Sequence, residues 1–210
     1  MNQEIYVFGS MTRGEVSPTS DTDILVVQND PDQAQCPASW SVYSRDTVKS
    51  YFAAGRLFAW HLHLEAVQIY PRGEHGLLAQ LGQPAPYLTM AEDLSDLINL
   101  LGDAARELQA DSPSSIYELG LVYTAVRDIA MTASWALLDR PSFSRYVPYE
   151  LPVRCPIPRD LYEIAMQARH ASTRGTREPE DFERAAKFMN AAFLIDWADF
   201  VRSQACQTLS

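Results

Sequence analysis

Two short groups of residues near the start of the chain have types and a spacing that could do chemistry. Gly9 and Ser10 close one apolar run, ten residues follow, and then Asp21 and Asp23 open a second apolar run. Alternation along an extended strand would place the two aspartates on the same side, with Cα atoms about 6 to 7 Å apart. Carboxylates held that close repel each other, and burying them without a partner is costly. The pair therefore predicts a divalent cation.

A magnesium ion would satisfy this pair and would bring a phosphate compound with it. Mg²⁺ takes one or two protein carboxylates and fills its other positions with water and phosphate oxygens. Gly9 lets the backbone approach a phosphate, and the Ser10 hydroxyl and nearby N–H groups can donate to its oxygens. Arg13, in the intervening loop, is a candidate charged donor to a triphosphate, with a solvated loop charge as the alternative. We predict Mg²⁺ at Asp21 and Asp23.

The elements that must position these residues follow from the apolar pattern. Short β-branched and aromatic runs predict strands at residues 5–8, 24–27, 40–43 and 68–70. Between the last two strands the chain has helical spacing, beginning at a cap provided by Ser44 or Asp46, and Gly55 can divide this helix in two. This arrangement predicts a small domain with a mixed sheet and covering helices.

After "GQPAPY" the pattern changes to long helices. Four are expected, at residues 90–108, 114–138, 159–173 and 179–203. The second begins at Ser114 or Ser115, of which only Ser115 has capping-box spacing to Glu118. We therefore predict an α+β chain, with a sheet domain over residues 1–85 and a helical bundle over residues 86–210.

Composition excludes some classes of function. The chain has 27 acidic and 17 basic side chains and a formal net charge of −10, which argues against binding to duplex nucleic acid. Its three cysteines are far apart without CxxC spacing, which predicts free thiols in a reducing compartment. No apolar run approaches the roughly 20 residues of a membrane span, and the N-terminus lacks signal-peptide features. We expect a cytoplasmic protein that does not bind membranes.

Gly9-Ser10, ten intervening residues and Asp21-x-Asp23 together resemble the signature of the DNA polymerase β-type nucleotidyltransferase superfamily, in the form seen in minimal nucleotidyltransferases. The flanking strands and the loop segments "TRGE" and "SPTSD" are similar as well. The resemblance implies transfer of a nucleoside monophosphate from ATP or another nucleoside triphosphate to a hydroxyl. It also implies Mg²⁺ at the two aspartates and phosphates at Gly9 and Ser10.

A third carboxylate is usual in this superfamily, on a neighbouring strand, where it can orient or deprotonate the attacking hydroxyl. Residues 38–44 contain no acid, and Asp46 is better explained as a helix cap, so Glu65 is the candidate. Otherwise the acceptor brings its own activation, or the enzyme is weakened. On a strand, His61 and His63 would form a metal triad with Glu65, but the segment favours a helix, on which they point apart.

The helical half offers further candidates. Arg127 lies in an otherwise apolar helix and needs an acid or a phosphate as partner. With "RPSFSRY", this stretch loosely resembles the helical substrate-binding domains of the kanamycin nucleotidyltransferase and HEPN-like group. Arg127 therefore either lines the nucleotide cleft or forms a buried ion pair. Tyr146 and Tyr149 are candidates for modification or self-priming, or they simply pack.

The leading hypothesis is a Mg²⁺-dependent, template-independent nucleotidyltransferase whose acceptor is a protein tyrosine, a small molecule or a short oligonucleotide. The resemblance suggests a bacterial antitoxin or an anti-phage defence protein, with a toxin or effector as partner and with an oligomer as one arrangement. An aminoglycoside-type adenylyltransferase is an alternative, because an acidic cleft attracts a cationic acceptor. A catalytically weakened, nucleotide-binding antitoxin or scaffold is the alternative from another class.

Overall fold

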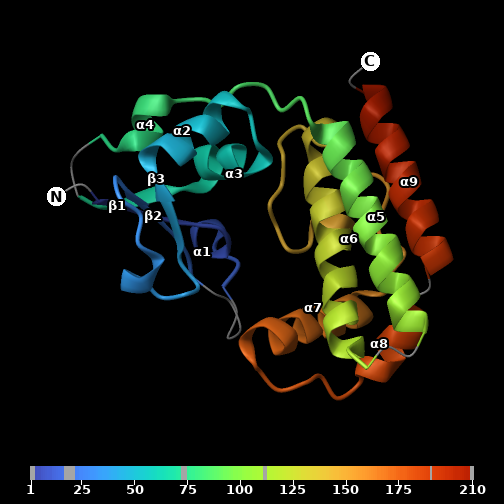
Figure 1. Cartoon of the computed structure of the whole chain (residues 1–210). Coiled ribbons are helices and arrows are strands. Elements are labelled where there is room, and N and C mark those ends of the chain that lie inside the picture. The colour runs from blue at the N-terminus through green and yellow to red at the C-terminus, as the bar shows by residue number, and fades with distance from the viewer. Residues whose placement is uncertain (1–2, 17–21, 72–74, 111–112, 190, 209–210) are drawn as a thin grey trace. The chain divides into compact units, whose positions relative to one another are not determined.

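The computed structural model describes residues 3–16, 22–71, 75–110, 113–189 and 191–208 and divides the chain into two compact units (Figure 1). The first unit covers Met1–Thr89 and the second, the helical unit, covers Met90–Ser210. A four-stranded mixed sheet with helices is followed by a bundle of helices, so the predicted α+β class is confirmed. Among the helices described, none is long and apolar enough to cross a membrane.

The sheet of the first unit has the strand order β3-β2-β1-β4. Its strands are β1 (Gln3–Phe8), β2 (Asp23–Gln28), β3 (Ser41–Ser44) and β4 (Val67–Tyr70), close to the four predicted from the sequence. β1 is antiparallel to both β2 and β4, while β2 and β3 are parallel. In the β1–β2 register Phe8 pairs with Asp23. The end of β1 therefore lies beside the start of β2.

Three helices cover one face of this sheet: α2 (Arg45–Ala53), α3 (Leu57–Glu65) and α4 (Leu77–Leu81). Alternate side chains of β1 and β2 pack with apolar residues of these helices; the core comprises Tyr6, Phe8, Leu25, Val27, Val48, Phe52, Ala59, Leu62, Leu77 and Leu78. Burying this apolar surface is the main force that holds the helices against the sheet.

The predicted division at Gly55 is confirmed. Gly55 has a φ of 63°, and a Cβ there would lie 2.2 Å from the carbonyl oxygen of Pro86, so the position requires glycine. Of the two predicted caps of α2, Ser44 is correct, because its side chain accepts a hydrogen bond from the Thr47 N–H at 2.9 Å. Asp46 lies in the first turn of α2 instead.

In the first unit, three short elements were not predicted: α1 (Ser10–Arg13), the 3-10 turn η1 (Gln33–Gln35) and α4. Each has five residues or fewer, too few to show helical periodicity in the sequence. Such short helices are not stable alone and depend on contacts with the rest of the fold.

A buried carboxylate ties α4 to the sheet and to α2. Glu4 in β1 is 8% exposed, and its carboxylate accepts hydrogen bonds from the Tyr6 hydroxyl, the Arg45 guanidinium and, at 2.6 Å, the Leu77 N–H at the start of α4. Burial by itself would raise the pKa of Glu4, but the three donors, led by Tyr6, hold the pKa below its ordinary value of 4.5. The ionised form is therefore favoured in the folded chain.

This network predicts a pH-dependent stability. Because the pKa of Glu4 is lower in the folded than in the unfolded chain, its contribution is full above the ordinary value of 4.5 and is lost as the pH falls through the folded-state value. Glu4→Gln should lower the free energy of unfolding at pH 7 by about 1 to 3 kcal/mol, and the difference from wild type should shrink below pH 4.5. Urea unfolding between pH 3 and 7 measures both, with exposed Asp46→Asn as control. A difference that stays constant with pH would contradict the assignment.

The helical unit is built around α6 (Ser115–Leu137), which packs against α5 (Met90–Gln109), α7 (Arg159–Arg174) and α9 (Ala191–Thr208) (Figure 1). A 3-10 turn, η2 (Val147–Tyr149), lies in the connection between α6 and α7. Eleven of the 23 residues of α6 are buried.

Two details of this unit differ from the sequence predictions. The single helix expected at residues 179–203 is two helices, α8 (Phe182–Phe188) and α9, because the buried Met189 leaves the helical conformation with a ψ of 66°. At the start of α6, Ser114 occupies the N-cap position without a side-chain capping hydrogen bond. Of the two predicted caps, Ser114 is therefore confirmed, and Ser115, which has the capping-box spacing to Glu118, is the first residue of the helix instead.

The crossing of α6 and α7 requires a glycine. A Cβ at Gly120 would lie 2.8 Å from Cα and 3.0 Å from N of Arg169, which are backbone atoms that cannot turn aside. Gly120→Ala should therefore lower the free energy of unfolding by about 1 to 3 kcal/mol, although alanine is the better helix former. Gly102→Ala in α5 is the matched control, since its Cβ would meet only Ile195 Cδ1 at 3.5 Å. Equal melting temperatures of the two variants would refute the close crossing.

Candidate functional site

The Gly9 backbone lies directly against the Asp23 carboxylate. Gly9 has φ 73° and ψ −145°, a conformation that essentially only glycine adopts. A Cβ at this position would lie 2.1 Å from Asp23 Oδ2, so the carboxylate occupies the space where a side chain would be. The β1–β2 register produces this contact, because Phe8 pairs with Asp23 and Gly9 follows at once. The structure thus places Gly9, from the Gly9–Ser10 pair, against Asp23, from the pair of aspartates.

Ser10 continues the turn as the first residue of α1 and is only 6% exposed. The turn is closed by the Gly9 carbonyl oxygen, which accepts hydrogen bonds from the Thr12 N–H at 3.1 Å and from the Thr12 hydroxyl at 2.9 Å. Asp21 lies outside the described residues, so its pairing with Asp23 stays a prediction. Gly9, Ser10 and Asp23 lie together where β1 ends and β2 begins.

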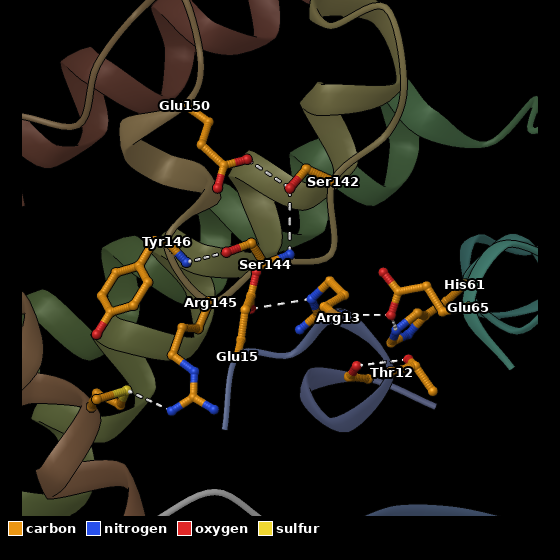
Figure 2. Close-up of polar contacts among 12 residues, drawn as sticks. Thr12, Arg13, Glu15, His61, Glu65, Ser142, Ser144, Arg145, Tyr146 and Glu150 are labelled. Atoms are coloured by element: carbon orange, nitrogen blue, oxygen red, sulfur yellow. Dashed lines mark hydrogen bonds and ion pairs between the residues drawn. The ribbon is translucent and has the colours of Figure 1, made fainter. Parts of the chain in front are cut away.

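Arg13, the last residue of α1, lies in a cluster of charged side chains (Figure 2). Its Nη1 is 2.5 Å from Glu65 Oε2, and its Nε is 3.1 Å from Glu15 Oε2. The same Glu65 oxygen is 2.9 Å from His61 Nε2. The Arg13 and Glu65 side chains are only 19% and 12% exposed. Glu65 is thus connected to α1, which begins at Ser10, by its ion pair with Arg13.

Comparison with known protein families agrees with this geometry. Residues 2–69 match the family model described as nucleotidyltransferase domain. They form a nucleotidyltransferase domain. The resemblance to the DNA polymerase β-type superfamily is confirmed for this part of the chain, and a helical region follows it. No curated protein matches the chain.

The donors present in the nucleotidyltransferase domain fit a hard cation. The Asp23 carboxylate lies against the backbone of Gly9, which has no side chain, and the buried Ser10 next to it carries a hydroxyl. Within the described residues, no group of three or more His, Cys, Asp or Glu side chains is placed to hold a metal by itself. Mg²⁺ does not require such a group, since it takes one or two carboxylates and completes its shell with phosphate oxygens and water. Asp21 and Asp23 are the residues that would hold it.

The two histidines of the nucleotidyltransferase domain pack separately. α3 is a helix, as expected, so His61 and His63 do not share the face that a strand would give them. The His61 ring meets the edge of Phe8 with centroids 5.2 Å apart, and the His63 ring meets Trp60 at 5.8 Å. The strand-type metal triad is therefore ruled out, and His61 has the packing and hydrogen-bonding role that the sequence favoured.

Arg127 in the helical unit has an acid as its partner. Its Nε and Nη2 lie 2.8 and 2.7 Å from the same oxygen, Asp128 Oδ1, and its guanidinium is 5.7 Å from the centre of the Tyr123 ring. The pair is half-buried. The structure thus shows the ion pair that was one of the two alternatives for Arg127, while a role in nucleotide binding stays a prediction.

The two candidate tyrosines both make hydrogen bonds in the helical unit. The Tyr149 hydroxyl donates to the Ile157 carbonyl at 2.9 Å, and burial raises the pKa of Tyr149 well above its usual range. The Tyr146 hydroxyl donates to Glu163 at 3.3 Å, and the Arg159 guanidinium lies 4.1 Å from its ring centre. These contacts fit the simpler alternative, in which both tyrosines pack in the connection between α6 and α7.

The sequence did not predict that Arg13 and Glu15, which follow the Gly9–Ser10 turn, form one charged cluster with Glu65 of α3. Glu15 was not singled out, Arg13 was a candidate either for phosphate binding or for a solvated loop charge, and Glu65 was a candidate third carboxylate. The i, i+4 spacing of His61 and Glu65 was a usable signal for their contact. The pairing of Arg13 with Glu65 spans 52 residues and had no local signal.

Proposed function

We propose that the nucleotidyltransferase domain transfers a nucleoside monophosphate from ATP or another nucleoside triphosphate to a hydroxyl group, with Mg²⁺ and without a template. The observation that carries this proposal is the contact of Gly9 with Asp23, since it joins a turn able to approach phosphate to a carboxylate able to hold Mg²⁺. Both residues lie inside the range that matches the nucleotidyltransferase family model.

In the proposed reaction the acceptor oxygen forms a bond to the α-phosphorus of the nucleotide. The bond from that phosphorus to the oxygen bridging it to the β-phosphate breaks, pyrophosphate leaves, and the hydroxyl proton passes to water. Gly9 and Ser10 bind the phosphates through backbone N–H groups and the Ser10 hydroxyl. Asp21 and Asp23 would hold Mg²⁺, which when bound neutralises phosphate charge and orients the triphosphate. Positioning and electrostatic stabilisation then account for most of the rate.

The acceptor class follows from charge and from the form of the motif. A net charge of −10 disfavours duplex nucleic acid and leaves a protein tyrosine, a short oligonucleotide or a small molecule. The minimal motif favours a bacterial antitoxin or defence protein acting with a toxin or effector. The acidic chain also favours the second candidate, adenylylation of a cationic aminoglycoside.

A third candidate is a nucleotide-binding scaffold without transfer activity. It is favoured by one observation, namely that β3 (Ser41–Ser44), the strand beside β2, has no acidic residue. Such a protein would bind nucleotide at the same turn and leave it unchanged.

Transfer from labelled nucleotides tests the proposal. The full chain is incubated with α-labelled ATP, GTP, CTP or UTP and Mg²⁺, alone, with aminoglycosides, with short oligonucleotides, or with a protein encoded beside its gene. Label on any acceptor, lost with EDTA, is the expected result and identifies the acceptor class. Calorimetry with the same nucleotides accompanies it. Binding without transfer would favour the scaffold. The absence of both binding and transfer would refute the proposed function.

A further inference from the structure

We propose that Arg13 and Glu65 are a positioning pair that holds α1, and with it the Gly9–Ser10 turn, in the shape that binds the triphosphate. In this assignment Glu65 does not take the proton of the attacking hydroxyl, and Arg13 does not bind phosphate. The inference rests on the proposed function for its consequence in nucleotide binding, but the pair itself is a feature of the chain without ligand.

The contacts of Glu65 argue against a role as general base. A general base must present an oxygen within hydrogen-bond reach of the proton that it removes. Glu65 Oε2 is already 2.5 Å from Arg13 Nη1 and 2.9 Å from His61 Nε2, and the side chain is only 12% exposed. Figure 2 shows Arg13 and His61 directed at this carboxylate. The Glu65 carboxylate is therefore placed to hold the side chains of Arg13 and His61.

The contacts of Arg13 argue against a role as phosphate donor. Its Nη1 is directed at Glu65 and its Nε lies near Glu15, and this Nε and the Glu15 oxygen are both buried. The Arg13 guanidinium thus lies against two carboxylates of this chain, those of Glu65 and Glu15. A phosphate-binding arginine presents its donors to the ligand, whereas the donors of Arg13 are directed at these carboxylates.

The pair supplies what α1 lacks by itself. α1 has four residues, and an isolated helix of that length does not persist in water. Arg13 ends this helix, and its bond to Glu65 connects it to the end of α3, 52 residues further along the chain. The position of α1 therefore depends on a contact from outside the loop.

The same cluster also reaches the other side of the turn. His61, which contacts Glu65, packs edge-on against Phe8, the residue immediately before Gly9. Phe8 precedes the Gly9–Ser10 turn and Arg13 follows it, so both ends of the turn are attached to α3. Loss of the Arg13–Glu65 ion pair should make the backbone from Gly9 to Gly14 more mobile. The contact between Phe8 at the end of β1 and His61 should remain.

Hydrogen exchange and nucleotide binding test the proposal together. The variants are Glu65→Gln, Arg13→Gln and the double variant. Without ligand, each should speed amide exchange at residues 9–14 to the same degree, and the double variant should add little, because the two residues act as one unit. Affinity for α,β-methylene-ATP with Mg²⁺, measured by calorimetry, should fall about 5- to 30-fold in each, with kcat changed less than affinity. The exposed pair Lys49–Asp46 on α2 supplies the control variants Lys49→Gln and Asp46→Asn.

Three results would overturn the proposal. Loss of kcat in Glu65→Gln with unchanged exchange and affinity would identify Glu65 as the base. Weaker binding in Arg13→Gln but not in Glu65→Gln would make Arg13 a phosphate ligand. Unchanged exchange in both would remove the positioning role. If the glutamine variants do not fold, Arg13→Lys and Glu65→Asp serve instead, and both must speed exchange at residues 9–14. If the wild type binds no nucleotide, the proposed function fails while the exchange result still decides the positioning role.

Discussion

Gly9→Ala is expected to lower nucleotidyl transfer by at least about 100-fold, since misplacing a reacting group by 1 Å can cost that much. The added Cβ would lie 2.1 Å from Asp23 Oδ2, and either the carboxylate or the turn must move away. The backbone conformation, φ 73° and ψ −145°, is also costly for any residue with a side chain. Initial rates of label transfer and Mg²⁺-dependent binding of α,β-methylene-ATP should both fall.

Gly14→Ala is the matched control for this prediction. Gly14 has the same φ of 73°, but nothing lies within 4 Å of the position that its Cβ would take. The control therefore introduces backbone strain of about 1 to 2 kcal/mol in the same loop without a collision. If the two variants lose equal amounts of activity, strain in the loop is responsible and the contact with Asp23 is not.

Asp23→Asn is expected to lower the rate of transfer by more than about 100-fold. Mutating a residue that only contacts a metal ligand commonly lowers metal affinity or activity about 10- to 100-fold, and a direct ligand should matter more. The amide keeps the shape of the side chain but removes the negative charge that Mg²⁺ requires. Nucleotide binding should lose its dependence on Mg²⁺, seen as a flat response when the metal is titrated against a fixed amount of α,β-methylene-ATP. Stability should stay equal to wild type or rise, because a charge held for function often destabilises the fold.

Asp30→Asn provides the comparison for charge alone. Asp30 is an exposed acid just beyond the far end of β2, and its replacement changes the net charge by the same amount. Transfer and Mg²⁺ dependence should be unaffected by it. A fully active Asp23→Asn would show that the carboxylate is dispensable and would leave only nucleotide binding or packing as its role.

Much of the fold could be predicted because its signals are local. The strands are short apolar runs between turn residues, and the long helices repeat apolar residues every three or four positions, as in α5. Gly55 divided a helix where the backbone needed a positive φ. Elements without enough residues for a period, such as α1 and α4, could not be found this way, nor could the break between α8 and α9 at Met189.

The sequence by itself determined which chemistry to expect at the candidate site, since the identities of Gly9 and Ser10 and their spacing to Asp23 predict a phosphate-binding turn beside a metal-binding acid. Only the tertiary structure decided which side chains face each other. The β1–β2 register places Asp23 against the Gly9 backbone, and packing of α3 on the sheet brings Glu65 to Arg13 across 52 residues. Residue type and spacing are local properties that can be read along the chain. Contacts between distant segments depend on burial of the shared core, which no short stretch of sequence encodes.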